Sequence, residues 1–188
     1  SVVDMTSHDI YCASVDELLQ RHGVILSQTI GKKIETSWVA WDELGNEWFT
    51  EEPIILRIGG TNYEFVFNHL DNLAITLNTQ NLHEAPAWHC AWNDADDTLF
   101  RLKWKEQGLP ELRALTGQII TNVRIIEYCF QGGSRQEAKG SWVLNGLEFI
   151  TSSGSVMLYN ALDENGVTSQ KSEQNEHLRA VELVTEDA

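Results

Sequence analysis

The sequence indicates that one supersecondary unit occurs twice, and this repeat constrains the fold more than any other feature. The pattern Leu26-x-x-x-Ile30-Gly31-x-x-Ile34 recurs as Leu112-x-x-Leu115-x-Gly117-x-x-Ile120. Further along, Leu56-Arg57-Ile58-Gly59-Gly60 and Glu64-Phe65 match Trp142-Val143-Leu144-Asn145-Gly146 and Glu148-Phe149. Repeated units bury a shared core against each other, so the repeat predicts architecture but no chemistry.

The first unit begins with a helix signal. Ser14 followed by Glu17 has the form of a capping box, and Gly23 marks a stop, which predicts a helix from Val15 to His22. Residues 24–30 either continue the helix or enter the sheet. Alternating apolar residues then predict strands at 33–41, 48–57, 63–67 and 73–77, joined by turns as an antiparallel meander.

The second unit repeats this order. Pro110 at a helix start predicts a helix to Thr116, and residues 119–130 form the strongest strand candidate. Asn145-Gly146 between apolar flanks predicts a hairpin turn. Residues 99–104 add a strand between the copies, and the stretch 170–188 is a docked strand, a docked helix or a tail.

The predicted fold class is therefore α+β, with two tandem repeats of a short helix followed by an antiparallel β-meander. The expected divisions are a first unit at 1–82, an inter-unit segment at 83–108, a second unit at 109–169 and a C-terminal segment at 170–188. The two units are expected to pack as one globular domain of ordinary size.

The charge of the chain narrows the class of partner. It has 28 Asp and Glu against 13 Lys and Arg, giving a net charge of -15 and a sequence pI near 4.6. Such a chain repels phosphate backbones and anionic lipid surfaces, which argues against nucleic-acid and membrane binding. A basic protein partner is favoured instead.

Cysteine use and hydropathy predict a cytoplasmic location. Cys12, Cys90 and Cys129 are widely spaced and odd in number, which fits a reducing compartment better than a disulfide framework. No apolar stretch approaches the roughly 20 residues of a membrane helix, and residues 1–10 do not resemble a signal peptide.

Candidate catalytic and metal-binding motifs are weak. His83, His89 and Cys90 lie close together but lack a zinc-ligand spacing, and Asp163-Glu164-Asn165-Gly166 lacks the rest of a calcium loop. Cys129 lies in an apolar strand, no serine lies in a nucleophile elbow, and the paired acids Glu51-Glu52 and Asp96-Asp97 are typical of solvated loops. We therefore expect a chain without catalytic residues, metal or cofactor.

Tryptophans beside acidic residues are the remaining functional signal. They combine large aromatic contact area with negative charge, as expected where a basic partner is held by aromatic anchors. The predicted contact residues are Trp41, Asp42, Glu43, Glu47 and Trp48 first, and Trp92, Asp94, Asp96 and Asp97 second.

A resemblance to a known group supports this interpretation. A small acidic chain with two repeated units, with Leu147-Glu148-Phe149 before a glycine turn and Tyr159-Asn160-Ala161-Leu162-Asp163-Glu164-Asn165-Gly166 after a strand, resembles bacterial immunity proteins encoded beside polymorphic or contact-dependent toxins. The resemblance implies a non-catalytic inhibitor that occludes a cognate basic toxin domain. It assigns no site residue, because such proteins bind through individual surfaces.

Two other functions stay open. A small-molecule-binding or enzymatic domain is expected to have a deep apolar pocket between the two units, lined by His69, His83 or His89 with carboxylates nearby. A structural subunit of a homo-oligomer is expected to use an exposed strand edge. The sequence does not fix the oligomeric state.

Overall fold

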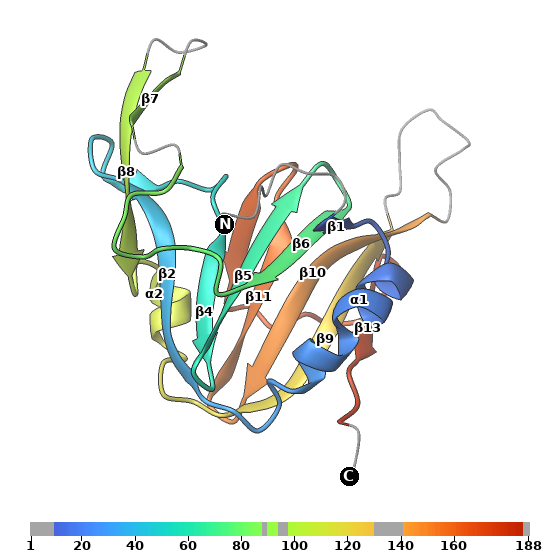
Figure 1. Ribbon diagram of the computed structural model, residues 1–188. Helices are drawn as coiled ribbons and strands as arrows, with labels where there is room; N and C mark the ends of the chain where they lie inside the picture. The colour runs from blue at the N-terminus through green and yellow to red at the C-terminus, as the bar shows by residue number, and fades with distance from the viewer. Residues whose placement is uncertain (1–9, 88–89, 94–97, 130–140, 186–188) are drawn as a thin grey trace.

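Two antiparallel β-sheets pack face to face in the computed structural model (Figure 1). The structure describes residues 10–87, 90–93, 98–129 and 141–185, and only the backbone of 90–93, 98 and 99. The first sheet has the order β1 (Tyr11–Cys12), β6 (Asn72–Leu77), β5 (Thr61–Asn68), β4 (Ile54–Ile58), β2 (Ile34–Asp42), β8 (Thr98–Glu106) and β7 (Cys90–Asn93), with β3 (Glu47–Trp48) also paired to β2. The second sheet has the order β12 (Asn165–Thr168), β11 (Gly154–Asn160), β10 (Trp142–Thr151), β9 (Ile120–Cys129) and β13 (Leu178–Glu182).

The predicted α+β class is wrong. The protein is mostly β, with 50% strand and 12% helix. The described chain has two helices, α1 (Val15–Ser27) and α2 (Pro110–Arg113), and α2 is a single turn. The fold is therefore a pair of sheets, and the helix-plus-meander repeat does not describe it, because the helices contribute little of the core.

The two sheets nevertheless share a strand order over five strands. In the first sheet the order β6-β5-β4-β2-β8 corresponds to β12-β11-β10-β9-β13 in the second. In each sheet a strand from later in the chain returns to pair with the long strand, β8 with β2 and β13 with β9, and in the first sheet β7 lies beyond β8. The repeat recognised in the sequence does not match β8 with β13, because the sequences of these two strands are not alike.

Gly31 and Gly117, which the sequence comparison aligned, occupy matching positions where the two sheets meet. Their φ angles are +86° and +87°, a left-handed backbone that glycine adopts without strain. The amide of Gly31 donates to the carbonyl of Ile120 and the amide of Gly117 donates to that of Ile34, each at 2.7 Å. These reciprocal bonds relate the two halves locally as a two-fold axis would.

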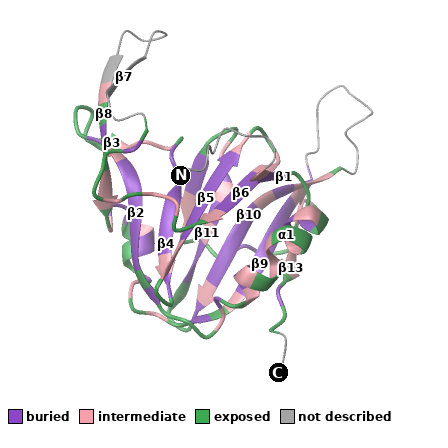
Figure 2. Ribbon diagram, in the orientation of Figure 1, coloured by how far each residue is buried: buried purple, intermediate pink, exposed green. Residues whose placement is uncertain are grey.

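One hydrophobic core lies between the sheets (Figure 2). Residues that alternate along β4, β5, β9 and β10 face inward, as the period-2 geometry of strands requires. The Phe65 and Phe149 rings meet across the interface with centroids 5.9 Å apart. Because both side chains are fully buried, the core is continuous across the two halves.

Helix α1 covers the end of the second sheet, where it packs on β9. The predicted cap is confirmed, since the Ser14 hydroxyl accepts from the Glu17 amide at 3.2 Å. The helix continues past the predicted stop at His22 and ends at Ser27. Gly23 does not terminate it, because Leu18 and Leu26 on either side are fully buried and hold the helix on the core.

The predicted hairpin turn at Asn145-Gly146 is wrong, because both residues lie inside β10. A bulge there shifts the pairing with β9 between Leu144 and Gly146. A Cβ on Gly146 would lie 2.7 Å from the Leu158 carbonyl oxygen. The glycine therefore permits a close approach of neighbouring strands instead of forming a turn.

A buried polar cluster fixes the C-terminal segment to the second sheet. Glu148 is fully buried and accepts from the Arg124 guanidinium Nε at 2.8 Å and from the Ser172 amide at 2.8 Å. The segment then continues into β13, so the docked strand among the predicted alternatives is confirmed. Within the described residues, neither helix is long and apolar enough to cross a membrane.

Candidate functional site

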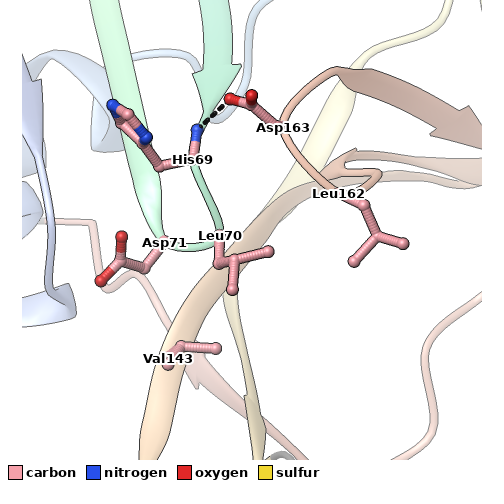
Figure 3. Close-up of a pocket in the computed structure, with 6 residues that line it drawn as sticks. All are labelled: His69, Leu70, Asp71, Val143, Leu162 and Asp163. Atoms are coloured by element: carbon pink, nitrogen blue, oxygen red, sulfur yellow. Dashed lines mark hydrogen bonds between the residues drawn. The ribbon is translucent and has the colours of Figure 1, made fainter.

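A hollow of about 610 Å³ opens where two turns from different sheets meet (Figure 3). The β5–β6 turn contributes His69, Leu70 and Asp71, and the β11–β12 turn contributes Leu162 and Asp163. Val143 of β10 completes the lining. Figure 3 shows the side chains of Leu70, Val143 and Leu162, with Asp71 to the left of Leu70 and the Asp163 carboxylate beside the backbone amide of His69.

The two turns carry the same short motif. Asn68-His69-Leu70-Asp71 follows β5, and Asn160-Ala161-Leu162-Asp163 follows β11. Since β5 and β11 hold equivalent places in their sheets, the hollow is built from two copies of Asn-x-Leu-Asp. We call these the Leu-Asp turns, after Leu70-Asp71 and Leu162-Asp163.

Hydrogen bonds between the sheets hold the Leu-Asp turns together. The Asp163 carboxylate accepts from the amide of His69, and the Asn160 side-chain amide donates to the carbonyl of Asn68 at 3.1 Å. Beside them, Asn165 accepts from the amide of Phe67 at 2.7 Å. The second turn therefore fixes the position of the first.

Backbone strain is concentrated at this site. His69, Leu162 and Asp163 have φ angles of +49°, +58° and +76°. A left-handed backbone at a non-glycine residue costs roughly 1–3 kcal/mol and is retained where the surrounding structure imposes it. In these two turns Leu70 is 54% exposed and Leu162 is 73% exposed.

Asp71 and Asp163 line the hollow, and Glu164 follows Asp163 in the chain; with Glu51, we call these four acids the acidic rim. Thr50 connects Glu51 to the second Leu-Asp turn, because its hydroxyl donates to Glu164 at 2.8 Å. Residues 42–56, 58–80 and 141–170 contain no Lys or Arg. Among the described residues, none of the four rim carboxylates forms a salt bridge with a Lys or Arg.

The first set of predicted contact residues lies in and around the β2–β3 hairpin. Trp41 and Trp48 pair across it, and both pack partly buried against the core. Asp42 is buried and accepts from the amides of Leu44 and Gly45, so it shapes the turn. These three residues have internal structural roles.

Cations of β8 surround the same hairpin. Glu43 forms salt bridges with Lys103 at 3.2 Å and Arg101 at 3.0 Å, and these two cations, Lys103 first, hold the pKa of its carboxyl below the usual value. The Lys105 ammonium lies 3.7 Å from the centre of the Trp41 ring. The hairpin is thus partly neutralised from within: Glu43 and Glu47 are both exposed, and Glu43 is paired with cations of β8.

The second set of predicted contact residues lies mostly outside the described residues. The backbone of Trp92 belongs to β7 and pairs with Leu99. Asp94, Asp96 and Asp97 fall in a stretch that the structure does not describe. Their contact role stays a prediction.

Glu52, predicted to be a solvated loop acid, is buried. It is 8% exposed, and its backbone carbonyl accepts from the Asn165 side chain at 2.8 Å. Burial first, and the neighbouring Glu51 charge second, raise the pKa of its carboxyl to about 7. Near neutral pH, the Glu52 carboxyl next to Glu51 of the acidic rim is therefore partly protonated.

Metal chemistry gains no support from the described chain. His83 is exposed, and His89 lies outside the described residues. The described residues contain no group of three or more His, Cys, Asp or Glu that could hold a metal ion. Asp163 and Glu164 bind the chain itself, through His69 and Thr50.

The sequence interpretation missed Leu70, Asp71, Val143 and Leu162, because it treated both Leu-Asp turns as plain reversals. A signal was present: an exposed leucine in an otherwise polar turn, repeated in the motif Asn-x-Leu-Asp. Comparisons of the chain with protein-family models, curated proteins and solved structures found no match.

Proposed function

We propose that this chain is a non-catalytic protein-binding inhibitor that occludes a basic partner, as the immunity proteins it resembles occlude a cognate toxin domain. The observation that supports this best is the combination of the acidic rim with two strongly exposed leucines at one end of the molecule. Exposed apolar groups ringed by charge are typical of protein contact surfaces. A cytoplasmic location is part of this proposal.

Electrostatics supports a basic partner. The net charge of -15 attracts cations over distances of about a Debye length, and among the described residues the rim carboxylates form no salt bridge with Lys or Arg. The β2–β3 hairpin is a weaker candidate for the same task, since Arg101 and Lys103 already neutralise Glu43. The rim is therefore the better steering surface.

A small-molecule-binding or enzymatic domain is the second candidate. The hollow lies between the two halves, His69 and two carboxylates line it, and its volume is within the usual range for ligand pockets. Against this candidate, the hollow is open, and two of its apolar side chains face solvent. A ligand pocket that buries its contents would enclose them.

A capture experiment with the whole chain tests the proposal. The immobilised protein is incubated with lysate of its source organism at low and high salt, beside a variant with Glu51→Lys, Asp71→Lys and Glu164→Lys. We expect the wild type to retain one basic protein in stoichiometric amount, and both high salt and the variant to release it.

The captured protein is then assayed for its own activity with increasing amounts of the inhibitor. Loss of that activity at one equivalent supports inhibition by occlusion. Capture of only acidic proteins, or equal capture by the variant, contradicts the proposal. Turnover of a metabolite by the purified chain would favour the second candidate.

A further inference from the structure

We propose that the hollow between the Leu-Asp turns is an anchor pocket for one aliphatic side chain of the partner, flanked there by arginine or lysine. This inference rests on the proposed function and specifies what the site recognises. It assigns the leucines to the apolar contact and the aspartates to the flanking cations.

The apolar part of the argument comes from exposure. Leu70, Val143 and Leu162 border the hollow, and the two leucines are 54% and 73% exposed. Burying a leucine-sized group among them removes apolar surface on both partners from water. The volume of about 610 Å³ admits a leucine or a larger side chain with room for its backbone.

The charged part comes from symmetry. Each turn places an aspartate directly after its leucine, so each half of the molecule contributes one carboxylate to the lining of the hollow. The hydrogen bond from the His69 amide engages one oxygen of Asp163, and a carboxylate accepts several bonds, so its charge is still offered to a cation. A basic residue on each side of the aliphatic group matches this arrangement.

The pocket is also preorganised. Asp163 and Asn160 bind the backbone of the first turn, so the leucines are held apart before a partner arrives. A preformed site avoids the entropic cost of ordering two loops on binding. The binding role explains why strained, left-handed backbone is retained at this site: it belongs to the turns that present the leucines to a partner.

Short peptides test the pocket directly. The probe is acetyl-Arg-Gly-Leu-Gly-Arg-amide, titrated into the full chain while backbone amide shifts of His69, Leu70 and Leu162 are followed by NMR. We expect saturable shifts with a Kd on the order of a millimolar. A probe with serine in place of leucine should bind about tenfold more weakly, and one with glutamates in place of arginines should not bind.

Two protein variants serve as a matched pair. Leu162→Ser removes one of the three aliphatic side chains that line the hollow and should weaken probe binding about tenfold. Leu44→Ser changes another exposed leucine, 50% exposed against 73% for Leu162, in the β2–β3 turn and should leave binding unchanged. Equal binding by both variants, or no shifts with any probe, overturns the anchor pocket.

The lysate capture separates this inference from the proposed function. If Leu162→Ser retains the basic partner as the wild type does while the charge-reversed rim loses it, the chain is an inhibitor without this anchor. If neither Leu162→Ser nor the charge-reversed rim variant changes capture, both proposals fail. Loss of the partner with Leu162→Ser but not with Leu44→Ser supports the anchor pocket.

Discussion

The rings of Phe65 and Phe149 meet edge to face across the two sheets, with centroids 5.9 Å apart and planes inclined at 65°. Phe65 belongs to β5 and Phe149 to β10, and both side chains are fully buried. An aromatic pair in this geometry contributes about 0.5–1.5 kcal/mol beyond the area that it buries. The contact therefore couples the stability of the two halves.

Replacing Phe149 tests this coupling. We expect Phe149→Ala to lower the free energy of unfolding by about 3–5 kcal/mol, because it leaves a cavity between the sheets. Chemical denaturation monitored by tryptophan fluorescence measures the change. Leu44→Ala at an exposed turn is the control and should change it by less than about 0.5 kcal/mol. Two separate unfolding transitions in the wild type would show that the halves are not coupled.

Replacing glycine by alanine should change stability in opposite directions at Gly117 and Gly23. Gly117→Ala places a side chain at a φ of +87° and should cost about 1 kcal/mol or more, although no atom obstructs it. Gly23→Ala lies inside helix α1, with its nearest contact at 3.7 Å from Leu19, and should stabilise by roughly 0.5–1 kcal/mol. Thermal unfolding of both variants provides the comparison. A stabilised Gly117→Ala would contradict the assigned backbone.

The buried ion pair gives a third prediction. Arg124→Met leaves the Glu148 carboxylate buried without its cation and should lower stability by about 3–5 kcal/mol. Because Ser172 is bound to both partners, the segment around it should also detach, and trypsin should cut after Lys171 faster. The double variant Arg124→Met, Glu148→Met removes both charges and should recover much of the loss. Unchanged cleavage after Lys171 in Arg124→Met would mean that the pair does not hold this segment.

Stability should depend on pH through Glu52. Its pKa is about 7 in the folded chain and 4.5 as the unperturbed value, so the folded state holds more protons between these values. The free energy of unfolding should therefore fall by about 3 kcal/mol as pH rises from about 4.5 to above 7. Glu52→Gln should abolish this slope and be the more stable protein at pH 8.

Glu51→Gln is the matched control for that experiment. Removing the neighbouring charge should move the pH midpoint of the Glu52 transition downward, because the Glu51 charge contributes to the raised pKa. Urea unfolding at several pH values measures both variants. If Glu52→Gln keeps the wild-type slope, another group is responsible.

Two acidic regions can be compared for partner association. Charge reversal of Asp94, Asp96 and Asp97 is the test of the contact loop predicted from sequence. Reversal of Glu51, Asp71 and Glu164 tests the acidic rim. We expect the rim variant to show the larger drop in association rate and in its salt dependence, measured by stopped flow with the captured partner. A larger drop in association rate for the Asp94, Asp96 and Asp97 variant would favour the contact residues predicted from sequence over the acidic rim.

Local features of the fold were predictable from sequence, and features that depend on distant residues were not. The Ser14 cap and the positive φ at Gly31 and Gly117 follow from short-range rules. The same rules failed at Asn145-Gly146, where the close approach of Leu158 explains the glycine better than a turn does. The turn propensity of a short segment contains no information about which other strand will lie against it.

The site shows the same limit more strongly. Leu70 and Leu162 are far apart in the sequence and line the same hollow only because the turns after β5 and β11 lie close together. The sequence predicts a solvated acid at Glu52, but in the folded chain Glu52 is 8% exposed and its backbone carbonyl accepts from the Asn165 side chain. The acidity of the region was predictable from composition. The hollow was not, because its lining residues come together only through the order of the strands in the two sheets.

The return strand β13 has a consequence for biosynthesis. Strand β9 receives its second hydrogen-bonded neighbour only when residues 178–182 have left the ribosome. Until then, the edge of β9 around Ile125 and Ile126 is open to pairing with another nascent chain. Slowed translation or a stop codon before residue 178 should therefore direct the chain toward aggregation or chaperone capture, even though most of its core residues have already been made.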